Sequence, residues 1–347
     1  IMEKVLKNYT ILLLYTTILC FIISLPNYIF RDRDSYVYYA GYYDIIFEDY
    51  YSNGLKNLLF NEPIFLFINS LLANIFSPYA IPIVFTVFSF SVFFWFLYKK
   101  SKNLLMFSIG LIIYFTITYT FHLQFVILRQ SIATSLLLIM LFYFKDYKKV
   151  LICCLLLGFI HSAFFFIFIL LNINFLSLKY IRSEYTRIIF QFVLFFILGF
   201  LALSVASYLG IRQAERLIET DVVIGGGSWI VWLCATLYII FYGDRSNKIL
   251  YEYCLVGMIV FLSLYFSTPF VGRLFASFIP AFIIIMVSRF RYIDLLIALL
   301  LFLPYMYLVS NGILFDLSFA IGSDELSRFS FFSLIYVIHE KFYNKIY

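Results

Sequence analysis

Long apolar runs alternate with short basic segments along the whole chain. The runs are continuous and about 15–22 residues long, which suits membrane-spanning helices and does not suit the alternating strands of a transmembrane barrel. They lie near residues 9–29, 63–77, 80–98, 103–121, 122–144, 150–178, 188–209, 228–242, 249–268, 271–288, 292–309 and 329–339. The pattern predicts an all-α, polytopic integral membrane protein with about 10–12 transmembrane or re-entrant helices.

Two of these runs do not fit a simple crossing. Residues 150–178 lie between two basic segments, so the chain has to go out and return within that stretch. Each arm would hold about 14 residues, roughly 21 Å at helical rise, against a hydrocarbon core of about 30 Å. We therefore expect a short helical hairpin that turns near His161. Two full crossings within 62–98 would place Lys99 outside, so we expect 63–77 to be re-entrant or in-plane.

The composition agrees with a membrane protein. Hydrophobic residues make up 64% of the 347 residues and charged residues 13%, and the mean hydropathy is +0.98. These values exclude a soluble globular protein, and no hydrophilic block is long enough for a separate soluble domain. We therefore predict one membrane domain over 1–347. The protein is expected to lie in the lipid bilayer. The net charge of +6 then reflects membrane orientation and does not indicate nucleic-acid binding. The five cysteines all lie in apolar runs without metal-ligand spacing, so no disulfide and no metal site are predicted.

The basic segments predict the topology. By the positive-inside tendency they belong to the cytoplasm, and the first run, after Lys4 and Lys7, is interpreted as an uncleaved helix. The segments occupy 99–102, 145–149, 179–187, 245–248, 289–291 and 341–345. Residues 31–61 and 210–227 then become extracytoplasmic loops. The first loop is rich in tyrosine, which favours an interfacial helix or, alternatively, a platform that packs on sugars.

Arg129 is the strongest anomaly in the chain. It lies about two turns inside the run 122–144, in what otherwise looks like a membrane-spanning helix. A guanidinium in hydrocarbon costs at least a few kcal/mol, and such residues usually face a polar cavity or a partner. We therefore expect Arg129 to meet an anion.

Other polar side chains fall on the same predicted outer side. They are Asp34, Tyr38, Glu62, His122, His161 and Arg273. Each has a plain structural explanation as well: Glu62 as a first-turn acid, His161 as a buried imidazole, and Arg273 as a snorkelling residue. Together they predict a cavity in which two arginines bind a diphosphate. Glu62, Asp34 or His161 would take a proton from a hydroxyl, and no metal or other cofactor is predicted.

The order of short motifs resembles the EpsG/Wzy-like family of bacterial polysaccharide polymerases. The motifs are Asp34-x-x-x-Tyr38, Glu62-Pro63, Leu128-Arg-Gln-x-x-Ala133, Gly158-Phe-Ile-His-Ser-Ala163 and Gly272-Arg273, spread over residues 30–280. The resemblance implies a glycosyltransferase-C-like, metal-independent polymerase of capsule, exopolysaccharide or O-antigen. It would work on the outer face of the bacterial cytoplasmic membrane and join undecaprenyl-diphosphate-linked repeat units.

The same resemblance implies roles for individual residues. Arg129 and Arg273 would hold the donor diphosphate, and Glu62 or His161, with Asp34 as a further candidate, would activate the acceptor hydroxyl. The predicted substrate contacts are Tyr38, Gln130 and His122, with Asp34 helping to bind sugar. A chain-length regulator and a flippase of the same pathway are possible partners, and no nucleic acid is expected.

Two alternatives stay open at this point. A transporter or flippase of lipid-linked glycans would need polar groups on both sides of the membrane midplane, and the cytoplasmic halves of the helices offer few. A membrane O-acyltransferase is suggested by His161 and the apolar bulk, although the cytoplasmic side lacks an evident His/Asp pair.

Overall fold

The structure is a computed structural model that describes residues 2–52, 54, 61–208, 227–268, 271–311 and 318. Its regular elements are helices, which confirms the prediction of an all-α polytopic membrane protein. The predicted second loop, 210–227, lies outside the described residues except for Gly227, and so does the last apolar run, 329–339.

Within the described residues, three helices are long and apolar enough to cross a membrane. They are Ile81–Lys100 (α6), Ala163–Tyr180 (α11) and the first part of Glu184–Tyr208 (α12). A fourth crossing results if the bent pair Leu104–Thr116 (α7) and Thr118–Phe125 (α8) is counted as one. The other apolar helices are shorter. Broken helices of this kind are tolerated in membranes where they are buried in protein or line a cavity.

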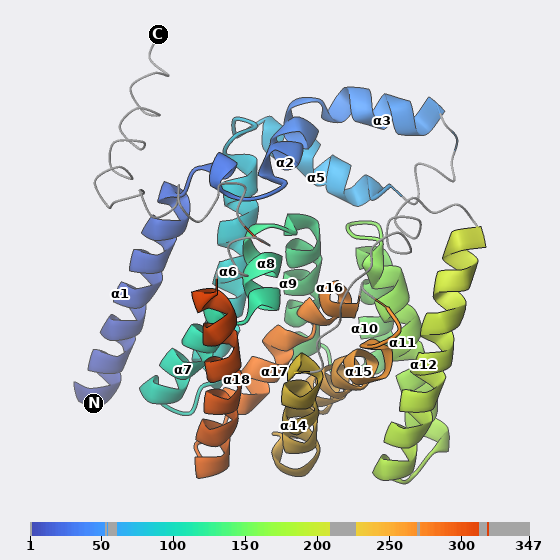
Figure 1. The fold of residues 1–347 in the computed structure, drawn as a ribbon. Coiled ribbons are helices and arrows are strands. Elements are labelled where there is room, and N and C mark those ends of the chain that lie inside the picture. Colours follow the sequence, from blue (N-terminus) through green and yellow to red (C-terminus); the bar gives the residue numbers. More distant parts are fainter. Residues whose placement is uncertain are drawn as a thin grey trace.

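Three short helices cover one end of the helical bundle (Figure 1). They are Arg33–Gly41 (α2), Tyr43–Ser52 (α3) and Pro63–Ala73 (α5). α3 is the outermost of the three in the view, and the long helices run away below them, with Met2–Ser24 (α1) on one flank and α12 on the other. The predicted first loop, 31–61, thus contains two helices, α2 and α3, where one was expected, and its interfacial position stays a prediction. The 11 residues of α5 would extend roughly 16 Å, too short to cross the bilayer, as expected for 63–77.

The bundle beneath is built on a helix that is buried almost throughout. This helix, Lys248–Leu264 (α15), contacts α11, α12 and three further helices of the C-terminal half. They are Gly227–Tyr242 (α14), Val271–Ala276 (α16) and Ile279–Val287 (α17), and α14 in turn contacts Tyr292–Ser310 (α18). Large aromatic side chains such as Trp232 and Phe261 fill this core.

The expectation of an unbroken helix around Arg129 was wrong. α7 and α8 meet at an angle of 77°, and α8 ends at Phe125 before Leu128–Tyr143 (α9) begins. The Thr120 hydroxyl bonds the carbonyls of Tyr114 and Ile117, and such local bonds compete with the helical ladder. The apolar pattern continues across both breaks, which is why it does not reveal them. Arg129 therefore lies in the first turn of α9 and not two turns inside a span.

The predicted hairpin is present. Tyr147–Leu157 (α10) and α11 pack against each other and turn at residues 158–162. α10 is too short to span, as expected, but α11 has 18 residues because the helix continues to Tyr180. The prediction that both arms are short was therefore wrong for the second arm. His161 lies in the turn, as predicted.

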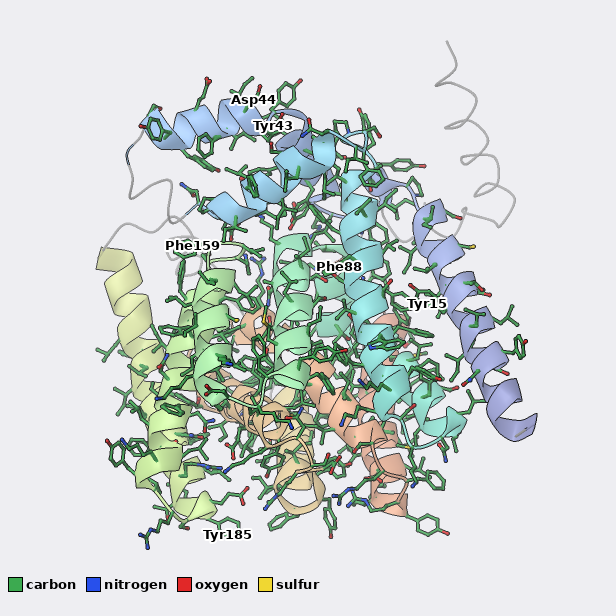
Figure 2. The ribbon with its side chains drawn as sticks, turned by 180° about the vertical axis from the view of Figure 1, so that it is seen from behind. Tyr15, Tyr43, Asp44, Phe88, Phe159 and Tyr185 are labelled. Atoms are coloured by element: carbon green, nitrogen blue, oxygen red, sulfur yellow. The ribbon has the colours of Figure 1, made fainter. Side chains whose placement is uncertain are left out.

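The basic segments gather at one end of the bundle. Lys102 N–H bonds the Val287 carbonyl, and Asn247 bonds the Leu141 carbonyl. Ion pairs join Arg245 to Glu184 and Arg289 to Asp244, at 3.2 and 3.1 Å. Figure 2 shows Tyr185, within one of these segments, at the end opposite Tyr43 and Asp44 of α3. The segments between residues 99 and 291 that were predicted to share one side of the membrane share one end of the molecule, and the last one, 341–345, lies outside the described residues.

Candidate functional site

Glu62 starts α5 in an unusual backbone conformation. Its φ of 62° and ψ of 55° are left-handed, which is uncommon for a residue other than glycine and is often found at functional sites. Pro63 follows at the first helical position, and the Ile64 N–H donates to the carbonyl of Phe159 in the hairpin turn, at 3.1 Å. Figure 2 shows Phe159 directly below the α5 layer. The start of α5 is thus fixed on the hairpin turn, and the Glu62 side chain does not cap its own helix.

The buried Glu62 carboxylate joins two distant parts of the chain. Its Oε2 accepts from Nη1 of Arg129. Its Oε1 pairs with Nδ1 of His161 at 2.8 Å and also accepts from the Ser162 N–H at 3.1 Å. The Ser162 N–H is one of the unpaired donors at the start of α11, so the positive end of that helix also faces the carboxylate. The anion that Arg129 was expected to meet is Glu62.

The surroundings keep Glu62 ionised. Burial alone would raise the pKa of its carboxyl, but the hydrogen bond and charge of His161, the charge of Arg129 and the Ser162 amide outweigh burial. They lower the pKa from 4.5 to about 2. An ionised carboxylate only accepts hydrogen bonds, so Nδ1 of His161 carries the proton in this contact. The other ring nitrogen, Nε2, is then the atom of His161 that can exchange a proton with a ligand.

Aromatic rings surround the guanidinium of Arg129. Its Cζ lies 5.0 Å from the ring centroid of Tyr39, 5.5 Å from Phe65 and 5.7 Å from Tyr36. These distances suit cation–π interactions, which are stronger when the cation is partly removed from water. Sequence reasoning missed both tyrosines. The helical spacing of Tyr36 with Ala40 would have indicated the buried stripe of α2.

Asp34 and Tyr38 lie on another face of α2. Both are exposed, and neither contacts Glu62, Arg129 or His161 through any of the hydrogen bonds or ion pairs within the described residues. They stay predicted sugar contacts at the outer surface. The buried charged residue of this helix is instead Arg33, whose Nε donates to the Phe125 carbonyl at 2.7 Å and whose Nη2 donates to Thr86 at 2.8 Å.

Arg33 explains how the break before α9 is stabilised. Phe125 is the last residue of α8, and its carbonyl lacks a partner within that helix. The guanidinium of Arg33 supplies the missing donor and stacks on Phe30, at 5.0 Å from the ring centroid. An arginine of the first predicted loop therefore fixes the helix start that carries Arg129. No motif in the sequence pointed to this role.

Gln130 holds the C-terminal half against α9. Its amide nitrogen donates to the Arg273 carbonyl at 2.6 Å and to the Ser277 hydroxyl at 2.8 Å. Ser277 also bonds Thr134 of the next turn of α9, at 3.0 Å. Gln130 was predicted to contact substrate. Its side chain is fully buried, and its amide donors position α16 instead.

Arg273 and His122 lie at the contact between α16 and α8. Gly272 makes this contact possible, since a Cβ there would come within 2.7 Å of the Tyr119 ring. Arg273 is exposed, and no hydrogen bond or ion pair of its guanidinium is found within the described part of the chain. His122 is half-buried and lies within electrostatic reach of Arg273 and Arg31. In the same described part its Nδ1 is buried without a partner. The positive charge of Arg273 thus lies near a ring nitrogen of His122 that can still donate or accept a hydrogen bond.

The predicted residues therefore form two groups. Glu62, Arg129 and His161 make direct contact. Arg273 and His122 form a second, cationic group, which Gln130 links to α9 through the backbone of α16. The predicted pairing of Arg129 with Arg273 on one diphosphate corresponds to no direct contact within the described residues, and it stays a prediction.

The chain matches a known protein family. A model of the EpsG family matches residues 8–321, which is most of the chain. The chain belongs to the EpsG family. This family is linked to exopolysaccharide synthesis, so the resemblance inferred from the motifs is confirmed. A search of curated proteins and a search of solved structures each gave no match.

The match covers both groups of the candidate site. Glu62, Arg129, His161, His122 and Arg273 all lie within residues 8–321. For this EpsG-family chain, the contact of a carboxylate, an imidazole and a guanidinium suits acid–base chemistry on a hydroxyl next to an anionic group.

Proposed function

We propose that this EpsG-family chain is a polysaccharide polymerase, a glycosyltransferase that joins undecaprenyl-diphosphate-linked oligosaccharide repeat units at the outer face of the bacterial cytoplasmic membrane. The observation that carries the proposal is the contact of Glu62 with both His161 and Arg129 at the capped end of the bundle. Family membership supports the proposal, because it links the chain to exopolysaccharide synthesis.

The proposed reaction has one bond-forming and one bond-breaking event. A hydroxyl oxygen of the acceptor's terminal sugar attacks the anomeric carbon of the donor glycan. The bond between that carbon and the diphosphate oxygen breaks, and undecaprenyl diphosphate leaves with the electron pair. The hydroxyl proton passes to Nε2 of His161. The growing chain thereby moves to the acceptor.

His161 is the proposed base, and Glu62 is its positioning residue. The 2.8 Å contact to Nδ1 fixes the ring orientation and its tautomer, and the carboxylate stabilises the imidazolium that forms. Glu62 itself is a poor base, because its pKa is lowered to about 2. The sequence left the base open between these residues and Asp34, and the geometry favours His161.

The arginines are proposed to meet the leaving diphosphate. Arg273 is exposed, with no acidic partner in the described residues, so its guanidinium is available for bidentate phosphate contacts. His122 next to it offers a further polar atom. Arg129 keeps Glu62 as its partner, but its partly exposed side chain adds positive charge near the imidazole, which pairs with the same carboxylate. Asp34 and Tyr38 would contact sugar at the rim.

A substitution of His161 tests the proposal in cells. We expect His161→Ala to abolish polymer while single lipid-linked repeat units accumulate, because the acceptor hydroxyl loses its base. The matched control is Glu184→Gln, which removes a carboxylate paired with Arg245 at the opposite end of the bundle. This control should leave polymer unchanged. Polymer of normal length from a normally expressed His161→Ala variant would refute the proposal.

A further inference from the structure

A groove of about 310 Å³ lies between α3 and α5, next to the start of α5. Its two walls are formed by helices that pack against each other at the capped end of the bundle. The lining residues are Tyr43, Asp44, Phe47 and Glu48 from α3, and Pro63, Leu66, Phe67 and Ser70 from α5. None of these residues has a role in the chemistry described above.

The lining combines aromatic rings with carboxylates. Tyr43 and Phe47 are four residues apart on α3, and so are Asp44 and Glu48, so each pair forms a stripe along one side of the helix. Phe67 is exposed on the opposite wall. Aromatic faces pack against the C–H faces of sugar rings, while carboxylates accept hydrogen bonds from their hydroxyls. A mostly apolar groove with a few polar groups at its edge is a common form of ligand site.

Both helices that form the groove also connect to the Glu62 cluster. Pro63 lines the groove and directly follows Glu62. On the other wall, the hydroxyl of Tyr50 in α3 lies 3.2 Å from that of Tyr39, whose ring faces Arg129. A ligand that extends along the groove toward Pro63 therefore approaches the residues proposed to activate a hydroxyl.

We propose that the groove between α3 and α5 binds the glycan part of a lipid-linked repeat unit. The inference deepens the proposed function and rests on it for the identity of the substrate. Charge favours a glycan over the alternative of a lipid: Asp44 and Glu48 repel a phosphate headgroup and give nothing to an acyl chain. Figure 2 shows Tyr43 and Asp44 at the outer end of the molecule, beyond α5, where a sugar chain has access.

Binding of a lipid-free probe tests this site directly. The probe is the oligosaccharide repeat unit released from the polysaccharide of the strain that encodes the chain. Its affinity for the full-length protein in detergent is measured by calorimetry or saturation-transfer NMR. We expect Phe47→Ala to weaken binding about tenfold, in line with the loss of an aromatic contact. The double substitution Asp44→Asn with Glu48→Gln should also weaken binding, and it keeps side-chain size.

The control is Ile45→Ala, an exposed apolar residue of α3 that does not line the groove. It should bind the probe as the unchanged protein does. Equal affinity in Phe47→Ala, the double variant and this control would overturn the proposal. A Phe47→Ala variant that changed only the amount of co-purifying lipid, with probe affinity unaltered, would overturn it as well.

A further variant separates this inference from the proposed function. Glu62→Gln should lose polymer formation but keep probe binding, because Glu62 does not line the groove. If Glu62→Gln still made polymer while Phe47→Ala lost probe binding, the reaction mechanism would be wrong and the glycan groove would stand.

Discussion

Among the described residues, two arginine–glutamate pairs with a buried carboxylate differ in their surroundings. Arg129 and Glu62 meet at the capped end, where 28% of the arginine side chain and 7% of the glutamate side chain are exposed. Arg187 and Glu252 meet at 2.9 Å between α12 and α15, with only 7% and 5% exposed. The first pair can reach a ligand, and the second cannot.

The partners of the two pairs differ as well. Around Arg187 and Glu252, a network of uncharged groups joins α10, α11 and α12. Gln191 donates to Asn174 at 2.7 Å and to Ser177 at 2.8 Å, and Asn174 donates to Tyr147 at 2.9 Å. Around Arg129 and Glu62, the third member is an imidazole with one ring nitrogen left for proton transfer. An enclosed network fixes helices, whereas an open pair with a histidine can perform chemistry.

The largest expected effect is on catalysis at the open pair. Glu62→Gln removes the charge that orients His161, so we expect the rate of polymer formation to fall about 10³- to 10⁴-fold, as when an Asp that orients a catalytic His is replaced by its amide. The measurement is polymer formed by purified protein from lipid-linked repeat units, with thermal unfolding as the check on folding. A fall of less than tenfold in a folded variant would contradict the proposed role.

The enclosed pair should affect stability instead. Arg187→Met leaves Glu252 buried and unpaired, which costs about 3–5 kcal/mol of unfolding free energy. Adding Glu252→Leu should restore most of that loss, because a buried pair replaced by apolar residues is often neutral. Thermal unfolding in detergent measures both variants. If Arg187→Met were as stable as the unchanged protein, or if the double variant were no more stable than Arg187→Met, the pair would not have the proposed role in stability.

Acid should weaken the open pair in a defined pH range. The pKa of Glu62 is lowered from 4.5 to about 2 on folding, so its ionised form stabilises the folded state above pH 4.5. That stabilisation is lost as the pH falls from 4.5 toward 2. The stability difference between the unchanged protein and Glu62→Gln should therefore shrink as the pH falls from 4.5 toward 2. A difference that grew over that range would have the wrong sign.

The smallest expected effect comes from the aromatic rings. Tyr39→Leu removes one cation–π contact of Arg129, together with the hydroxyl contact to Tyr50, and keeps an apolar side chain there. We expect a loss of about 0.5–1 kcal/mol, a few-fold reduction in polymer rate. A matched change, Tyr42→Leu, alters an exposed tyrosine with no such contact to Arg129. If both variants reduced the rate equally, the contact would have no specific role.

Much of the fold could be predicted from the apolar pattern, because each long apolar run has to be buried in protein or face lipid. The two breaks around α8 did not follow, since Thr116, Thr118 and Thr120 look like ordinary members of an apolar run. The hydroxyl bonds of Thr120 depend on the local backbone geometry, and the contact of Arg33 with Phe125 joins segments that are distant in the sequence. A hydropathy pattern does not contain them.

The site residues were recognisable as polar groups in apolar surroundings, and His161 also by its place in a predicted turn. Their contacts were not recognisable, because Glu62 precedes Arg129 by 67 residues and His161 by 99. Arg187 was missed for another reason: it was counted with the basic segment 179–187, and only the structure shows that it points into the bundle toward Glu252.

The central claim is that His161, oriented by Glu62, accepts the proton of the acceptor hydroxyl. Chemical rescue tests it most directly: polymer formation by purified His161→Gly is measured with and without added imidazole. We predict a rate at least about a hundredfold below that of the unchanged protein, with partial recovery as imidazole is added. Arg129→Ala, which keeps its histidine, should show no such recovery. A folded His161→Gly variant that makes polymer at the normal rate without imidazole would contradict the account.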